Sequence, residues 1–117
     1  MAARAIVYIY KPLAHTKENL EAAEYIAKQR AASLSATVVK TVWGLESWAD
    51  PIAKLNEICE KSNAWLIVTP TLDHIRGDTD AAVKIADLAT AQPPAHWPWQ
   101  VPNELVATYV TKSRARR

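Results

Sequence analysis

The chain has 117 residues, of which 50% are hydrophobic, and its formal net charge is +2. This length is enough for one domain with a hydrophobic core and too short for two, and so small a charge excess does not indicate a class of partner. The single cysteine, Cys59, excludes an internal disulfide. No stretch is long and apolar enough to span a bilayer, and the first apolar run, 5–10, is too short for a signal-peptide core. We therefore expect a cytoplasmic protein with no membrane partner.

The first half of the chain predicts a strand, a helix and a strand. The run 5–10 is rich in β-branched and aromatic residues and ends before Pro12, which favours a strand. Apolar residues at helical spacing predict a helix over 17–34. The run 36–43, A-T-V-V-K-T-V-W, predicts the second strand.

The second half continues this alternation. Asp50 followed by Pro51 is a favoured helix start, and the apolar stripe after it predicts a helix that ends at Ser62. The unbroken apolar run 65–68 predicts a strand that is buried on both faces, as in the centre of a parallel sheet. A third helix is predicted over 78–92, before two consecutive prolines.

The remaining segments complete the predicted fold. We expect 93–102, rich in proline and tryptophan, to form an extended loop held on the core by its indole rings. Residues 105–111 predict a last strand, and 112–117 a disordered basic tail. Alternating strands and helices imply βαβ crossovers, so we predict a three-layer α/β/α fold with a mainly parallel central sheet of about four strands. Residues 1–111 would form this single domain.

Several kinds of site are excluded by composition. The only glycines, Gly44 and Gly77, do not lie between the first strand and the first helix, so neither a dinucleotide fingerprint nor a P-loop is present. The three histidines are far apart and there is one cysteine, which makes a zinc site improbable. We therefore predict neither a cofactor nor a metal.

Three segments share a further pattern. Residues 8–20 are Y-I-Y-K-P-L-A-H-T-K-E-N-L, residues 50–58 are D-P-I-A-K-L-N-E-I, and residues 66–78 are L-I-V-T-P-T-L-D-H-I-R-G-D. In order and spacing they resemble the motifs Y-A-R-V-S-T-x-x-Q-x-L, R-P-x-L-x-x-L-L and L-x-V-x-K-L-D-R-L-G-R-S of serine recombinase catalytic domains, the resolvase and invertase family. The resemblance implies strand order 2-1-3 with a later strand. The long linking helix and the DNA-binding domain of the family have no counterpart.

The resemblance also implies where the active site would lie and that it has lost its reactive groups. That family uses a serine nucleophile and several arginines on the transferring phosphate. Alanine stands at the serine position, proline and aspartate at two arginine positions, and histidine at a third, while the aspartate of the last motif matches. Together with their neighbours, the residues of this degenerate site are Lys11, Pro12, Ala14, His15, Asp50, Asp73, His74 and Arg76.

Two interpretations of this edge follow. The first is a non-catalytic, resolvase-like binding module that forms a homodimer, acts through protein contacts and associates with DNA in a regulatory or accessory role. The alternative is a small α/β enzyme or ligand-binding domain that uses His15, Asp73, His74 and Arg76, with His15 and Asp73 as an acid–base couple. A turn of this kind more often has a purely structural role, in which side-chain-to-backbone bonds of Asp73 hold it.

Aromatic and basic residues elsewhere are candidate contacts for a partner. Trp48 lies in a connection, and two tryptophans of the proline-rich loop could stack on bases or dock on a larger protein, or simply tie the loop down. The tail could make a weak nucleic-acid contact. The candidate contact residues are Trp48, Trp97, Trp99, Lys112, Arg114, Arg116 and Arg117.

Overall fold

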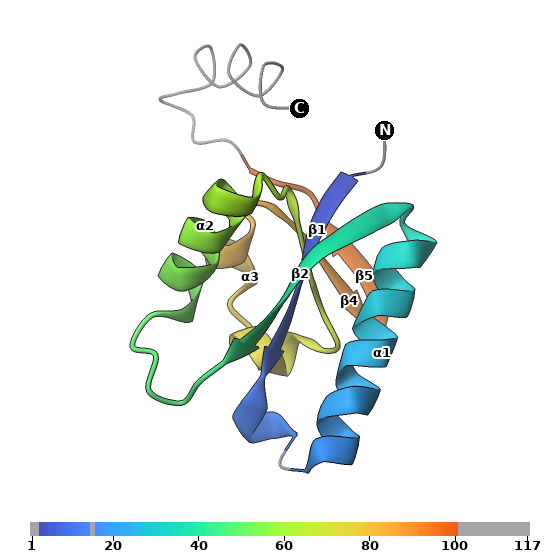
Figure 1. Ribbon diagram of the computed structural model, residues 1–117. Helices are drawn as coiled ribbons and strands as arrows, with labels where there is room; N and C mark the ends of the chain where they lie inside the picture. Colours follow the sequence, from blue (N-terminus) through green and yellow to red (C-terminus); the bar gives the residue numbers. More distant parts are fainter. Residues whose placement is uncertain (1–2, 15, 101–117) are drawn as a thin grey trace, which may run out of the picture.

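The computed structural model describes residues 3–14 and 16–100, which form one five-stranded sheet with helices on both faces (Figure 1). In chain order, the strands and α-helices are β1 (Ala3–Tyr10), α1 (Lys17–Ser33), β2 (Ala36–Gly44), α2 (Pro51–Ser62), β3 (Leu66–Thr69), α3 (Thr79–Ala82), β4 (Asp87–Ala91) and β5 (Pro94–Trp97). Two 3-10 turns follow strand ends, η1 (Lys11–Leu13) after β1 and η2 (Leu72–Ile75) after β3.

The sheet is mainly parallel and has the order β2-β1-β3-β4-β5. β1 pairs in parallel with β2 and β3, β3 pairs in parallel with β4, and β5 runs antiparallel to β4. In Figure 1, α1 lies on one side of the sheet and α2 and α3 lie on the other. The predicted three-layer α/β class is therefore confirmed. Among the described residues, no helix has both the length and the apolar character needed to cross a membrane.

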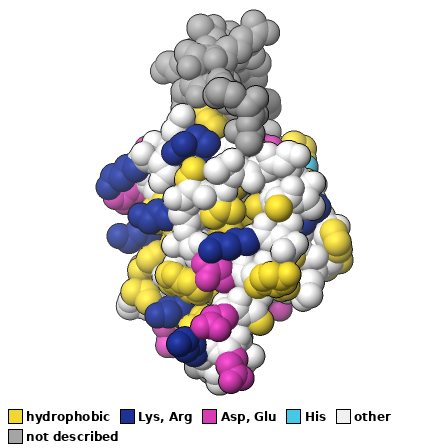
Figure 2. Space-filling view, turned by 45° about the vertical axis from the view of Figure 1, so that its right-hand side comes forward, with side chains coloured by type: hydrophobic (Ala, Val, Ile, Leu, Met, Phe, Trp, Pro, Cys, Tyr) yellow, Lys and Arg dark blue, Asp and Glu magenta, His cyan; other side chains and the backbone are white. Residues whose placement is uncertain are grey.

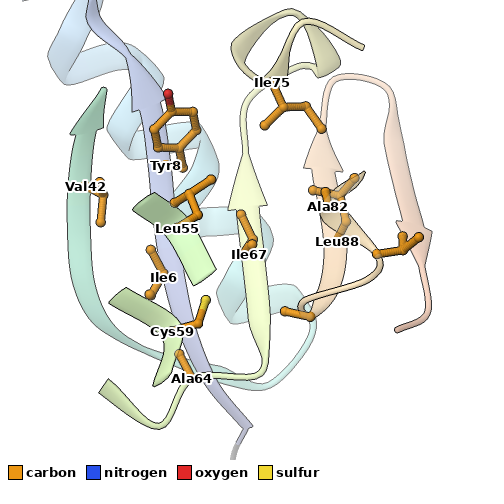
Figure 3. Close-up of a cluster of buried hydrophobic side chains, with 12 residues drawn as sticks. Ile6, Tyr8, Val42, Leu55, Cys59, Ala64, Ile67, Ile75, Ala82 and Leu88 are labelled. Carbon is orange, nitrogen blue, oxygen red and sulfur yellow. The ribbon is translucent and has the colours of Figure 1, made fainter. Parts of the chain in front are cut away.

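The core consists of two apolar layers, which follow from the alternation of side chains along β1. Ile6 and Tyr8 belong to the layer beneath α2 and α3, whose buried residues are shown in Figure 3. Ala5, Val7 and Ile9 belong to the layer beneath α1. β1 can supply both layers because its neighbours β2 and β3 cover both of its edges and helices cover both of its faces.

The predicted third helix is wrong over most of its length. One helical turn, α3, is followed by a strand, β4, in which Leu88, Ala89 and Thr90 are buried. The segment has alanines at helical spacing, but β3 offers it an open edge, and four residues of β4 pair with β3 in register. Pairing with a distant strand outweighed local periodicity here, as tertiary context often does.

The proline- and tryptophan-rich segment is partly strand and partly loop. β5 pairs with β4, so the fourth and fifth strands both precede the strand predicted at 105–111. Beyond β5, the Trp99 indole N–H donates to the Lys84 carbonyl at 3.0 Å, and its ring centroid lies 5.1 Å from that of Trp65. The expected role of an indole ring in holding this loop is thus present at Trp99. The predicted strand 105–111 and the tail 112–117 lie outside the described residues.

Candidate functional site

Most of the predicted site residues within the described ranges meet at the carboxyl edge of the sheet. β1 leads into η1 and β3 leads into η2, and these two strands are neighbours. The main-chain N–H of Tyr10 donates to Nδ1 of His74 at 2.9 Å and joins the two connections directly. Ala14 and His74 therefore lie at the same end of the molecule. His15 lies outside the described residues.

His74 is buried and connects the turn after β3 to the end of β1. Because Nδ1 accepts a hydrogen bond from Tyr10, that nitrogen is unprotonated and the imidazole is neutral. Burial lowers the pKa of His74 below its usual 6.5, and the nearby charge of Asp73 opposes this shift. Use of Nδ1 as a general base would first require the Tyr10 contact to break.

The turn after β3 is closed by its own backbone. Main-chain N–H groups of Arg76 and Gly77 donate to the carbonyls of Asp73 and Leu72 at 3.0 and 2.9 Å. Arg76 has a left-handed conformation, with φ of 57°, and its guanidinium carbon lies 5.7 Å from the centre of the Tyr10 ring. Asp73 and Arg76 are both exposed. The charged groups of this turn thus face solvent, and the buried group is His74.

Two of the positions at which the resemblance predicts replaced reactive residues have structural roles. Ala14, at the position of the serine, is 6% exposed and offers only a methyl group. Asp50, at the position of an arginine, is the N-cap of α2, where its carboxylate accepts the N–H of Ala53 at 3.1 Å. The edge retains the exposed cations of Lys11 and Arg76 but has no nucleophile at Ala14.

Tyr8 is a residue of this edge that the sequence did not identify. Its side chain is fully buried, and its hydroxyl points toward the carboxyl edge in Figure 3 and has no hydrogen-bond partner among the described residues. Burial, with a smaller contribution from Tyr10, raises the pKa of Tyr8 to about 12, so the phenol stays neutral. A Cβ at Gly44 would collide with this hydroxyl, which explains the glycine at the end of β2. The one feature of the sequence that could have indicated Tyr8 is its spacing of two residues from Tyr10, which puts both side chains on one face of a strand.

Trp48 and two leucines complete the surface of the edge. Trp48 is partly buried and stacks on Tyr8, with ring centroids 6.4 Å apart and planes at 22°. Leu13 and Leu45 follow the neighbouring strands β1 and β2 and are 48% and 43% exposed. The sequence did not mark these leucines, because exposure of a single apolar residue in a loop has no periodic signal.

The other tryptophans of the predicted contact set lie elsewhere. Trp97 pairs with Leu88 across β4 and β5 and packs on the core, and the main-chain N–H of Trp99 donates to the Asp87 carboxylate at 2.8 Å. Asp87 begins β4, so Trp99 lies toward the amino edge of the sheet, at the opposite end from His74. These tryptophans therefore do not share a site with the carboxyl edge. The basic residues of the tail lie outside the described residues.

No group of histidine, cysteine, aspartate and glutamate residues that could hold a metal ion occurs within 3–14 and 16–100. Comparison of the chain with protein families, with characterised proteins and with solved structures finds no match.

Proposed function

We propose that this protein is a non-catalytic binding module on a resolvase-like scaffold and that it forms a homodimer through the carboxyl edge of its sheet. The proposal is supported by the structural roles of two residues at positions where the resemblance predicts reactive groups. Ala14 supplies a buried methyl group, and Asp50 caps a helix. The strand order 2-1-3, with Ala14 and His74 at one edge, is the arrangement that the resemblance implies.

The chemistry of strand exchange needs groups that this edge lacks. Attack on a phosphodiester requires a nucleophile, and stabilisation of the transferring phosphate requires several cations placed around it. Ala14 cannot attack, and Asp50 would repel a phosphate where the family has an arginine. Lys11 and Arg76 alone cannot offset both changes. A scaffold that retains this edge without the reaction is best explained by binding.

The exposed surface of the edge suits a second copy of the chain. We infer that Leu13 and Leu45, which are exposed and follow the adjacent strands β1 and β2, form the apolar centre of the interface, and the N–H of Trp48 donates to the Leu45 carbonyl at 3.1 Å. Around this centre lie exposed charges of both signs, Lys11 on the β1 side and Glu46 on the β2 side. A two-fold interface needs a patch that complements itself, and two such patches can place each lysine against the glutamate of the other copy.

The test is the mass of the protein in solution over a range of concentrations, measured by size-exclusion chromatography with light scattering. We expect a dimer for the natural chain and at least about tenfold weaker association for Leu13→Asp/Leu45→Asp, because charges replace two exposed leucines that the proposed interface would bury. Tyr25→Asp is the matched control, since Tyr25 is an apolar residue on α1 that is 63% exposed. A monomer at every concentration would contradict self-association, and a dimer that survives the double substitution would place the interface elsewhere.

A further inference from the structure

A pocket of about 260 Å³ lies between the first half of α1 and the ends of β1 and β2. Its lining combines two apolar side chains with two lysines and two glutamates: Lys11, Lys17, Leu20, Glu21, Glu24 and Trp43. Figure 2, which brings the α1 side of the molecule forward, shows basic, acidic and hydrophobic side chains interspersed on this face. The predicted site did not include this pocket, apart from Lys11.

The apolar part of the pocket comes from Trp43 and Leu20. Both are partly buried and pack against the core layer beneath α1, so their positions are fixed by the fold. Trp43 is the next-to-last residue of β2 and pairs with Ile9 of β1, which places it close to the beginning of η1. An indole beside a leucine offers a flat apolar surface to one small side chain or ring.

The charged groups around this surface are arranged by the helix. Lys17, Glu21 and Glu24 are spaced by four and three residues and therefore share one face of α1. Glu24 is already engaged, because its carboxylate lies 2.9 Å from Nζ of Lys28. Glu21 is the carboxylate left for a ligand, while Lys11 and Lys17 lie at the end of the pocket near the beginning of α1.

We propose that this pocket binds a free α-amino acid with an apolar side chain. The carboxylate of the ligand would lie against Lys11 and Lys17, its ammonium group against Glu21, and its side chain on Trp43 and Leu20. The pocket is smaller than the range of about 300–1,000 Å³ that is usual for drug-sized ligands, so a molecule of amino-acid size is appropriate. This inference concerns a second site and does not depend on self-association.

The mixture of charges selects this class of ligand over other small molecules with a flat ring. A nucleotide would place its phosphate near the lysines but would bring further negative charge toward Glu21 and Glu24. An amine without a carboxylate would leave both lysines without a counter-ion. Only a ligand that carries both charges close together, next to an apolar group, satisfies each part of the lining.

The test is isothermal titration calorimetry of the full chain with L-phenylalanine and L-leucine, compared with two analogues of phenylalanine. Hydrocinnamate lacks the ammonium group and phenethylamine lacks the carboxylate. We expect both amino acids to bind, and each analogue to bind about three- to tenfold more weakly than phenylalanine, as is reasonable for the loss of one partly exposed charge pair. Adenosine monophosphate should bind more weakly than either amino acid.

Variants of the pocket residues test which charged side chain binds which charged group of the ligand. Glu21→Gln should weaken phenylalanine about three- to tenfold and leave hydrocinnamate unchanged, because only phenylalanine carries the ammonium group. Lys17→Gln should weaken phenylalanine and hydrocinnamate and leave phenethylamine unchanged. Glu60→Gln makes the same change of charge on α2, on the opposite face of the sheet from the pocket, and should leave all three unchanged.

The proposal is overturned by any of three results. These are the absence of binding heat up to about 10 mM amino acid, equal binding of phenylalanine and both analogues, and tighter binding of adenosine monophosphate. Loss of binding in Glu60→Gln equal to that in Glu21→Gln would also overturn it, since the effect would then be one of net charge. Thermal melting of each variant establishes that it is folded.

Discussion

His74 shows how a single residue at this edge couples stability to pH. Its neutral imidazole accepts the Tyr10 N–H in the folded protein, and burial keeps its pKa below 6.5. The unfolded chain therefore binds a proton at His74 more readily than the folded chain does. It follows that the contribution of His74 to stability is complete above about pH 6.5 and is lost as the pH falls toward the lower folded pKa.

We predict that two replacements of His74 separate the contribution of its hydrogen bond to stability from the pH dependence of stability. His74→Leu should lower the free energy of unfolding by about 1–3 kcal/mol, because the buried Tyr10 N–H loses its acceptor. His74→Asn keeps an acceptor close to the position of Nδ1 and cannot be protonated, so it should retain more stability and depend less on pH. Urea unfolding at about pH 7.5 and about pH 5.5 measures both quantities. Parallel losses on acidification in the natural chain and His74→Asn would show that His74 is not the sensing group.

Among the elements, α1 is tied to the far side of the sheet by Arg30. Its guanidinium donates to the carbonyl of Thr90 in β4 at 2.9 Å and to that of Ala95 in β5 at 3.4 Å. It also donates to the Ser33 hydroxyl at 3.2 Å, within its own helix. One planar group thus joins three elements, and its fork of donors is what makes this geometry accessible to arginine.

We predict that Arg30→Met lowers the free energy of unfolding by about 1–3 kcal/mol, because buried carbonyls of β4 and β5 lose a charged donor. Arg30→Lys should recover only part of this loss, since an ammonium group cannot reproduce the fork. The matched control is Lys28→Met on the same helix, which removes the exposed pair with Glu24 and should cost at most about 1 kcal/mol. Denaturant unfolding measures all three, and equal losses for Arg30→Met and Lys28→Met would contradict the role of Arg30 as a tie.

The elements also show which parts of the fold were predictable. β1, α1, β2, α2 and β3 each have a local pattern, such as the cap formed by Asp50 or the apolar run of β3, and were located within a few residues. β4 was not, because the alanines at 82, 86 and 89 have helical spacing and the strand character of 87–91 comes from pairing with β3. The site followed the same rule. The predicted ends of the first and third strands were enough to place Ala14 and His74 at one edge. The burial of the Tyr8 hydroxyl was not predictable, because it depends on how Gly44 of β2 aligns with β1, and the local sequence does not contain that information.

On the scale of the whole molecule, the carboxyl and amino edges of the sheet carry different groups of residues. The carboxyl edge carries Leu13, Leu45 and the His74 turn. At the other end, the N–H of Gln100 donates to the Val83 carbonyl at 2.8 Å and brings the last described residue close to Trp99 and Asp87. The basic residues at 112–117 follow from that end in the sequence. These residues lie outside the described ranges, and we treat a nucleic-acid contact of the tail as a proposal separate from the proposed dimer edge.

We predict that the tail gives the protein a weak affinity for duplex DNA that does not depend on base sequence. Binding should weaken steeply with salt, and truncation after residue 111 should reduce the slope of log K against log salt by at most about 3.6, or about 0.9 for each of four cations, Lys112, Arg114, Arg116 and Arg117. Fluorescence anisotropy with a short labelled duplex over a salt series measures this slope for one tail at a time. Leu13→Asp/Leu45→Asp is the control and should keep the natural slope, because it leaves the four cations of the tail in place. An unchanged affinity and slope after truncation would exclude the tail as a DNA contact, and a lost slope in the control would place the contact at the carboxyl edge.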